Sequence, residues 1–429
     1  MLIVTDLPFD LEKKILACVP KESPVQWQNT CKRWYTVLQD LLAEKHLAQA
    51  GREYILLLNS NVFSTIINLQ EIHNNVEPSM EFGGKLGSLQ DSNDLDIHDI
   101  FYCEGLVLCT RVGKEMLVVV CNPSNGETRY VQPRTSYSKN DLYALGYKGS
   151  KSSCVNSYKM LRYCRYYNMQ LRRTVSEFEL YDFMSDSWRV LNVDKHDWDI
   201  SARGVSVKGN TYWVAKKKDD QFILSFDFTR ERFGFLPLPY KNDDPLDILY
   251  DEHEDTAVLS VVRDEQLSVL HQYLHMFSLE MKIWVSNQIN TNKVSWGEFL
   301  VVDVGNLMIG GWLNVVSFLL DEEHRVAVCC STGKGDNEEE FTSIFIIGEN
   351  IERHVYVQRI NDGSWPHIMN YVPSPQVHIV KKSRRKSKRK PITRRHEPEE
   401  GNSERSVKET KVTPRAKPIA YRSFFPKRV

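Results

Sequence analysis

Short apolar runs dominate residues 53–348, and they constrain the fold more than any other feature of the chain. The runs are rich in β-branched and aromatic residues, polar turns separate them, and little between them has the period of a helix. They include EYILLLNS, GLVLCT, EMLVVVCNPSNGETRYVQP, SEFELYDFMSDSWRVLNV, GVSVKGNTYWVA, QFILSFDFTRERFGFLPLP, TAVLSVVRD, LHMFSLEMKIWVSN, HRVAVCCSTG and FTSIFIIG. We therefore predict an all-β domain over residues 52–380.

Three of these runs end in the same way, with an Asn or Asp followed by a short polar turn and then an aromatic residue or Arg. The residues are Asn122, Asp182 and Asp227, separated by 60 and 45 residues. Asx side chains suit such turns because they accept hydrogen bonds from backbone amides two residues later. Repetition at roughly this period favours a β-propeller, with a β-sandwich carrying long loops as the rival.

Residues 1–48 have a different pattern, which predicts a small module of three short helices. Leu7, Leu11, Ile15, Leu16 and Val19 fall on one helical face, and Pro20 ends that helix. Ser23 is a suitable N-cap, followed by Pro24 at the first helical position and by a second apolar face that contains Cys31 and Trp34. So many apolar residues either contact a partner or pack only on one another, and the pattern leaves both alternatives open.

The carboxy-terminal 49 residues, 381–429, are strongly basic. They contain 18 Lys or Arg and 5 Asp or Glu, a net charge of +13, whereas the other 380 residues carry a net charge of −14. Such a segment cannot bury enough apolar surface to offset its ordering entropy, so we predict a disordered tail. Its basic cluster favours a nuclear localisation signal, with a nucleic-acid contact and a solubilising tail as alternatives; the cluster is Lys381, Lys382, Arg384, Arg385, Lys386, Lys388, Arg389 and Lys390.

Composition places the chain among ordinary folded proteins, with 41% hydrophobic and 26% charged residues. No run of about 18 uncharged apolar residues occurs, and the first residues lack the pattern of a signal peptide. We therefore expect a soluble protein that is not secreted and does not bind a membrane. The nine cysteines form no CxxC pair and lie mostly in apolar runs, which predicts buried, reduced thiols.

Catalytic motifs are weak, and the sequence predicts a binding protein without cofactor or metal. His271 and His275 are four residues apart, but the surrounding pattern is that of a strand, which would separate them by about 13 Å. The glycines of GNLMIGG and STGKGDN lack the spacing of a phosphate-binding loop. A catalytic triad assembled from distant positions remains open at this point.

The stretch LPFDLEKKILACVPKESPVQWQNTCKRWYTVLQD resembles an F-box. It matches the usual pattern in order and spacing at eleven positions: Leu7, Pro8, Asp10, Leu11, Ile15, Leu16, Val19, Pro20, Cys31, Lys32 and Trp34. It departs from the pattern at Cys18, where Arg is usual, and in SPVQWQN. The later segments FYCEGLVLCT, VCNPSNGETRYVQPRTSY, YALGY and GVSVKGNTYWVA are similar to the kelch-related F-box-associated domain of plant F-box proteins.

The resemblance implies a helical F-box (1–48) and a propeller-like substrate-binding domain (52–380). Together with the basic tail (381–429), which is predicted from its composition and lies beyond the resemblance, this gives an α+β multidomain protein. It implies a non-catalytic substrate-recognition subunit of an SCF-type ubiquitin ligase, with a Skp-type adaptor, a cullin scaffold and an unknown protein substrate as partners. The adaptor-binding set would be Leu7, Pro8, Leu11, Ile15, Leu16, Val19, Pro20, Cys31 and Trp34.

With an import receptor on the tail, we expect the protein in nucleus and cytoplasm. The alternative is a nuclear nucleic-acid-binding or scaffold protein that acts through the tail. YCRYY (163–167) and GNTYWVA (209–215) could line a binding face of the β domain, although aromatic residues in strands more often belong to the core.

Overall fold

The computed structural model describes residues 53–379, with gaps at 70–71, 75–76, 86–95, 113–116, 133, 135–137, 139, 150–156, 171, 194–196, 219, 241–255, 264, 276–277, 291, 306–311, 335–338, 360–364 and 376. The predicted helical module (1–48) and basic tail (381–429) therefore lie outside the described residues. Within those residues, the structure consists of β-strands and one turn of 3-10 helix, η2 (Ile72–Asn74). No helix in this part of the chain has the length and apolar character that crossing a bilayer requires.

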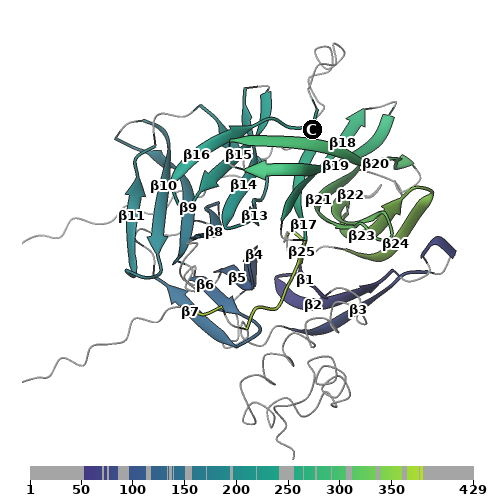
Figure 1. The fold of residues 1–429 in the computed structure, drawn as a ribbon, viewed down its shortest axis with the longest axis horizontal. Coiled ribbons are helices and arrows are strands. Elements are labelled where there is room, and N and C mark those ends of the chain that lie inside the picture. The colour runs from purple at the N-terminus through teal and green to yellow at the C-terminus, as the bar shows by residue number, and fades with distance from the viewer. Residues whose placement is uncertain are drawn as a thin grey trace, which may run out of the picture. The chain divides into compact units, whose positions relative to one another are not determined.

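The strands form six antiparallel sheets, which are arranged in a ring as the blades of a β-propeller (Figure 1). Blade A contains β25 (His367–Asn370), β1 (Glu53–Leu58), β2 (Asn61–Asn68) and β3 (Ser79–Lys85). Blade B contains β4 (Asp96–Cys103), β5 (Leu106–Val112), β6 (Leu117–Asn122) and β7 (Glu127–Val131). Blade C contains β8 (Leu142–Lys148), β9 (Ser157–Asn168), β10 (Arg173–Asp182) and β11 (Ser187–Leu191).

Blade D contains β12 (Asp199–Ile200), β13 (Val205–Val207), β14 (Asn210–Lys217), β15 (Asp220–Asp227) and β16 (Arg232–Leu236); β12 and β13 both pair with β14 and together take the place of a first strand. Blade E contains β17 (Thr256–Val262), β18 (Gln266–His275), β19 (Ser278–Asn290) and β20 (Lys293–Asp303). Blade F contains β21 (Trp312–Asp321), β22 (Val326–Lys334), β23 (Glu340–Gly348) and β24 (Ile351–Arg359). The propeller is confirmed, and the sandwich is not the fold.

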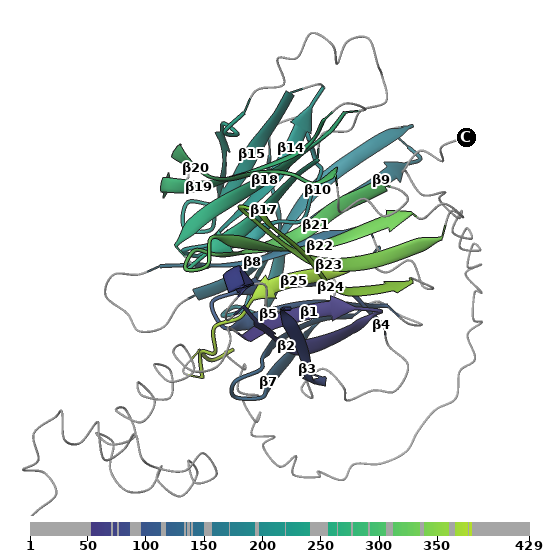
Figure 2. The ribbon, with the colours of Figure 1, turned by 90° about the vertical axis from the view of Figure 1, so that its right-hand side faces the viewer.

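The ring is closed by pairing the two ends of the described chain. β25 pairs antiparallel with β1, with Asn370 opposite Tyr54 and His367 opposite Leu57. Figures 1 and 2 both show the yellow β25 beside the purple β1. Because the first blade takes its first strand from the end of the chain, the six sheets form a continuous ring with no open blade.

Antiparallel strands place the turns of every blade alternately on two faces of the ring. One face carries the turns that join the first strand to the second and the third strand to the fourth. We call it the closing face, because Glu53 and Tyr371 lie there beside the paired ends of β1 and β25. The face with the turns between second and third strands is the distal face. The two faces differ in what the chain places on them.

Apolar side chains pack between neighbouring blades, and this explains why the inner strands are continuous apolar runs. In β1, Leu56 packs in the cluster between blades A and F, whereas Leu57 packs in the cluster between blades A and B. Both faces of such a strand are buried, so polar and apolar residues do not alternate along it. Outer strands such as β11 are largely exposed.

The predicted Asx turns are confirmed on the closing face. The side-chain oxygens accept hydrogen bonds from backbone N–H groups two residues later: Asn122 from Ser124 at 3.0 Å, Asp182 from Met184 at 2.8 Å and Asp227 from Thr229 at 2.8 Å. Each joins the third strand of its blade to the fourth. The same place in blade E is taken by Asn290, which the sequence pattern did not single out.

A buried ionic cluster joins the strands of blade C. Arg162 is fully buried and donates to Asp141 at 2.7 Å and to Glu179 at 2.8 Å, and Arg134 donates to Glu179 at 2.6 Å. Two arginines and two carboxylates balance in charge. The cluster is fully paired, which is how buried charges are tolerated in a protein interior.

Candidate partner-binding faces

The two residue sets that the sequence predicts for adaptor binding and nuclear import lie in parts of the chain that the structure does not describe. This holds for the adaptor-binding set between Leu7 and Trp34 and for the basic cluster between Lys381 and Lys390. Both sets stay predictions. The candidate faces that the structure does describe belong to the propeller itself.

On the closing face, residues 371–375 and 377–379 form a strap across blade B. The Asn122 side-chain amide donates to the carbonyl oxygens of Ser374 at 2.9 Å and Val377 at 2.7 Å. The Asn125 side-chain amide donates to the carbonyl oxygens of Pro375 and Val377, both at 3.1 Å. Asn122 therefore has two roles, since its oxygen holds the β6–β7 turn while its nitrogen holds the strap.

Two further features place the strap against the blades. Gly105, in the β4–β5 turn, has a φ of +83°, and a Cβ atom there would lie 2.4 Å from the Cβ of Ser374. Beyond Val377, the side chain of Ile379 is buried in the core cluster of blades B, C and D. The closing face of blade B is thus occupied by the strap.

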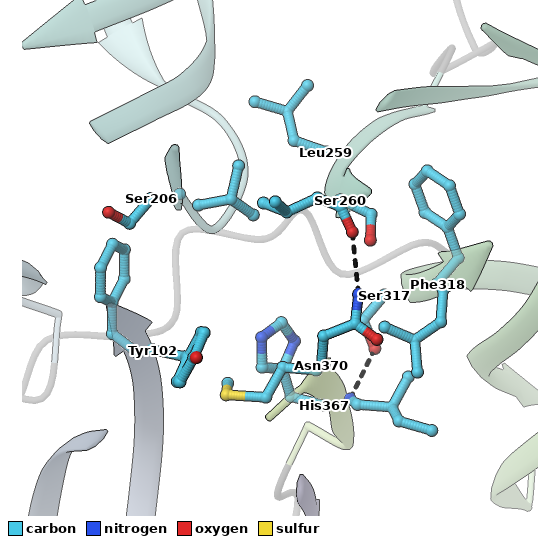
Figure 3. A pocket seen from close by; sticks show the side chains of 15 residues that line it. Tyr102, Ser206, Leu259, Ser260, Ser317, Phe318, His367 and Asn370 are labelled. Atoms are coloured by element: carbon cyan, nitrogen blue, oxygen red, sulfur yellow. Dashed lines mark hydrogen bonds between the residues drawn. The ribbon is translucent and has the colours of Figure 1, made fainter. Parts of the chain in front are cut away.

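The first strands of blades B, D, E, F and A line a pocket on the axis of the ring (Figure 3). Asn370 donates to the carbonyl oxygen of Val261 at 2.9 Å, and the backbone N–H of Ile368 donates to the Ser317 hydroxyl at 2.9 Å. These bonds tie the closing strand β25 to blades E and F. The labelled side chains in Figure 3 are mainly apolar or neutral.

His367 is the one titratable side chain among the residues lining this pocket, apart from the phenol of Tyr102. Burial lowers the pKa of His367 well below its usual value, and the nearby Arg203 guanidinium lowers it further. Its Nδ1 atom has no hydrogen-bond partner among the described residues. Arg203 itself donates to Asp99 at 2.7 Å and to the carbonyl oxygen of Pro366 at 3.3 Å. The imidazole is therefore neutral at physiological pH, and a polar atom could be held there.

The aromatic segments singled out in the sequence divide into core and surface. Tyr212 and Trp213 are buried, so GNTYWVA belongs to the core. In YCRYY, Tyr163 is buried and its ring stacks on Phe178 with the centroids 4.8 Å apart, whereas Tyr166 and Tyr167 are both exposed. Because these two tyrosines belong to the strand that leads into the β9–β10 turn, they lie toward the distal face.

The segment around His271 is a strand, as predicted, and the His271 ring stacks on Tyr240 with the centroids 3.8 Å apart. The described cysteines are free and buried. Burial raises the pKa of Cys330 to about 12, which keeps this thiol protonated and unreactive. No group of three or more His, Cys, Asp or Glu that could hold a metal occurs within the described part of the chain.

Sequence reasoning missed the strap and the pocket on the axis of the ring. Neither has a local signal, because Asn122 and Ser374 or Arg203 and Pro366 are far apart in the chain and meet only when the ring closes. The stretch VPSPQV carries the turn-forming residues of an ordinary loop. Nothing in it indicates that it is anchored.

Comparisons with known proteins give a consistent result. The family model of the F-box associated beta propeller domain matches residues 53–377. An F-box/kelch-repeat protein of Arabidopsis thaliana is 46% identical over 380 residues, which cover 87% of this chain and 95% of that protein. A putative F-box/kelch-repeat protein of the same plant is 44% identical over 401 residues, which cover 92% of this chain and 98% of that protein. The similarity thus extends over nearly the full length of both relatives.

Proposed function

Since this chain belongs to the family of F-box proteins with an F-box-associated β-propeller domain, we propose that it is the substrate-recognition subunit of an SCF-type ubiquitin ligase. Proteins of this family are non-catalytic adaptors, and the propeller suits binding. The observation that carries the proposal is the match of the propeller over residues 53–377 together with relatives that are F-box proteins. In this role the chain tethers a substrate, which raises the effective concentration of substrate lysines near the ubiquitin carrier.

The difference between the two faces of the propeller supports separate places for adaptor docking and substrate binding. Glu53, at which the described chain begins, and the strap both lie on the closing face. The F-box-like segment before Glu53 is attached at that face. We therefore assign adaptor docking to the amino-terminal segment and substrate binding to the distal face.

Adaptor docking is assigned to Leu7, Pro8, Leu11, Ile15, Leu16, Val19, Pro20, Cys31 and Trp34, by their match to the F-box pattern. Leu11 and Trp34 are proposed as anchors, because large buried aliphatic and aromatic side chains dominate interfaces. The cullin scaffold would be reached through the adaptor and not by direct contact.

The test is co-purification of the full chain with a Skp-type adaptor. We expect Leu7→Ala combined with Pro8→Ala to weaken adaptor binding by about tenfold or more, because loss of two adjacent side chains from the interface is expected to cost upwards of about 1.4 kcal/mol. Arg33→Ala, on the predicted outward side of the helix, is the matched control. Circular dichroism should show an intact β domain in both variants. Unchanged adaptor binding in the double variant would contradict the proposal.

The basic tail is proposed to serve nuclear import, through the cluster that begins at Lys381 and ends at Lys390. A chain ending at residue 380 should then move from nucleus to cytoplasm and keep its adaptor. The alternative function, nucleic-acid binding through the tail, is favoured by its net charge of +13. That alternative predicts that the full chain binds RNA or DNA with steep salt dependence and that the same truncation abolishes this binding.

A further inference from the structure

A two-stranded ribbon projects from blade C. The first strand β8 ends its pairing with β9 at Leu142 opposite Tyr163, and the outer strand β11 ends its pairing with β10 at Leu191 opposite Phe178. Beyond these pairs, residues 164–168 and 173–177 pair only with each other among the described strands. The ribbon therefore has two free backbone edges, which are sites where another strand can add.

The ribbon lies on the distal face, because it consists of the ends of the second and third strands of its blade, which meet at a turn on that face. This is the face opposite the strap and the paired ends of the chain. A partner held by the ribbon would not compete with the strap. A ribbon of two strands is marginally stable by itself, so its projection costs the fold stability and suggests another role.

The side chains of the ribbon are cationic and partly apolar. Met169 is 72% exposed, and Tyr166 and Tyr167 are each 42% exposed. Arg172 and Arg173 are exposed, and neither forms an ion pair or side-chain hydrogen bond with any residue that the structure describes. Charged residues alone could serve to protect an edge from aggregation, but exposed aromatic and Met side chains work against that purpose.

The acidic and basic groups of the ribbon are unequally available. Arg165 pairs with Asp199 of blade D at 3.0 Å, and the Glu177 side chain is only partly exposed. Arg172 and Arg173, which stand where β10 begins, are the exposed charged groups of the ribbon that have no counter-charge among the described residues. Guanidinium groups bind carboxylates with good geometry, so the available chemistry selects an acidic partner.

We propose that the β9–β10 ribbon is the substrate-docking element and that it takes an extended acidic segment of a partner protein as an added strand along the β10 edge, Arg173 to Glu177. This inference rests on the proposed role as a substrate-recognition subunit. Backbone hydrogen bonds along the free edge supply affinity, and Arg172 and Arg173 select for carboxylates. Tyr166, Tyr167 and Met169 supply exposed contact area for apolar side chains between the acidic ones.

A protein segment fits these residues better than a nucleic acid does. Among the described residues, only two guanidinium groups of the ribbon lack a partner, whereas proteins that hold a nucleic acid neutralise several phosphates. A free strand edge offers alternating donors and acceptors that match a polypeptide backbone. Binding of RNA in place of peptides is kept as an outcome of the test.

The experiment selects binders from a displayed library of random peptides of about 12 residues on the immobilised full chain. The enriched peptides should be acidic, and a synthetic copy should bind the full chain in fluorescence anisotropy. Arg172→Glu combined with Arg173→Glu should weaken that binding by at least tenfold. The matched control is Lys208→Glu with Lys293→Glu, the same charge change at two turns of the closing face, which should alter the affinity less than twofold.

A second peptide tests strand addition directly. The same sequence is made with backbone amides N-methylated at the odd positions or at the even positions, which blocks one or the other edge of the extended peptide, and the version that blocks the docking edge should bind at least tenfold more weakly. Peptides without acidic bias, equal binding by both charge variants, or RNA binding that depends on Arg172 and Arg173 in place of peptide binding would each overturn the proposal.

Adaptor co-purification separates this inference from the proposed function. The Arg172→Glu and Arg173→Glu chain should retain its adaptor. If the acidic peptide binds through the ribbon but no adaptor accompanies the wild-type chain, the ubiquitin-ligase role fails and the peptide site stands. If the adaptor is recovered and the peptide does not bind, the ribbon proposal fails alone.

Discussion

Replacing Arg162 by Met tests the account of the buried cluster in blade C. The guanidinium binds Asp141 through two nitrogens, at 2.7 and 3.0 Å, and binds Glu179 at 2.8 Å. In the variant, Glu179 would keep Arg134, but Asp141 would keep only neutral donors, the Ser138 amide and the Tyr143 hydroxyl, among the described residues. The change leaves one buried carboxylate without a counter-charge.

Breaking a buried pair by removing one partner costs about 3–5 kcal/mol. We therefore expect Arg162→Met to lower the free energy of unfolding by that amount. Arg165→Met is the matched control, three positions along the same strand, where Arg165 is 51% exposed and pairs with the exposed Asp199. A surface pair of this kind contributes about 0.2–1 kcal/mol. Urea unfolding followed by tryptophan fluorescence gives both values.

The loss should also depend on pH. Burial raises the pKa of the Asp141 carboxyl even beside Arg162, so the folded protein binds this proton more readily than the unfolded chain. Its contribution to stability is therefore greatest below the ordinary pKa of Asp and declines as pH rises through the raised value. Without Arg162 the pKa rises further, and the penalty should be smaller at about pH 5 than at about pH 8. A loss equal to that of Arg165→Met, or one independent of pH, would refute the reasoning.

Two further predictions concern the strap and the ring. Gly105→Ala should destabilise the folded protein more than Gly126→Ala does. Both glycines have a positive φ, which costs about 1–2 kcal/mol for Ala. The new Cβ would meet Ser374 only at Gly105, since nothing lies within 4 Å of a Cβ at Gly126. Equal midpoints of urea unfolding for the two variants would show that the strap moves away from residue 105 at no cost in stability, and would contradict this prediction. A chain ending at residue 365 lacks β25 and should lose cooperative unfolding, whereas a chain ending at residue 380 should keep it; calorimetry distinguishes them.

The sequence predicted the strands and turns well, because their signals are local. Asn122, Asp182 and Asp227 could be recognised because each follows an apolar run and precedes a polar turn. Asn290 has the same role but lies among Asn287 and Asn292, so no single residue stood out. Continuous apolar runs indicated buried strands, and the structure adds that neighbouring blades cover both of their faces.

Features that depend on register or closure could not be predicted. Arg162 and Arg165 are three positions apart in one strand, yet one is buried in an ionic cluster and the other is at the surface. The number of blades was open because the loops between strands vary in length, as residues 237–255 between β16 and β17 illustrate. The projecting ribbon depends on where β8 and β11 stop pairing, which no local pattern reports.

The pairing of β1 with β25 has a consequence for synthesis in the cell. Tyr54 meets its partner Asn370 only after the ribosome has added more than 300 further residues, which takes roughly 15–60 s at typical translation rates. During that interval the nascent chain can form sheets, but the ring is still open. The backbone edge of β1 that later pairs with β25 stays exposed. Premature stop codons late in the message should therefore yield aggregation-prone chains for chaperones and proteases to remove.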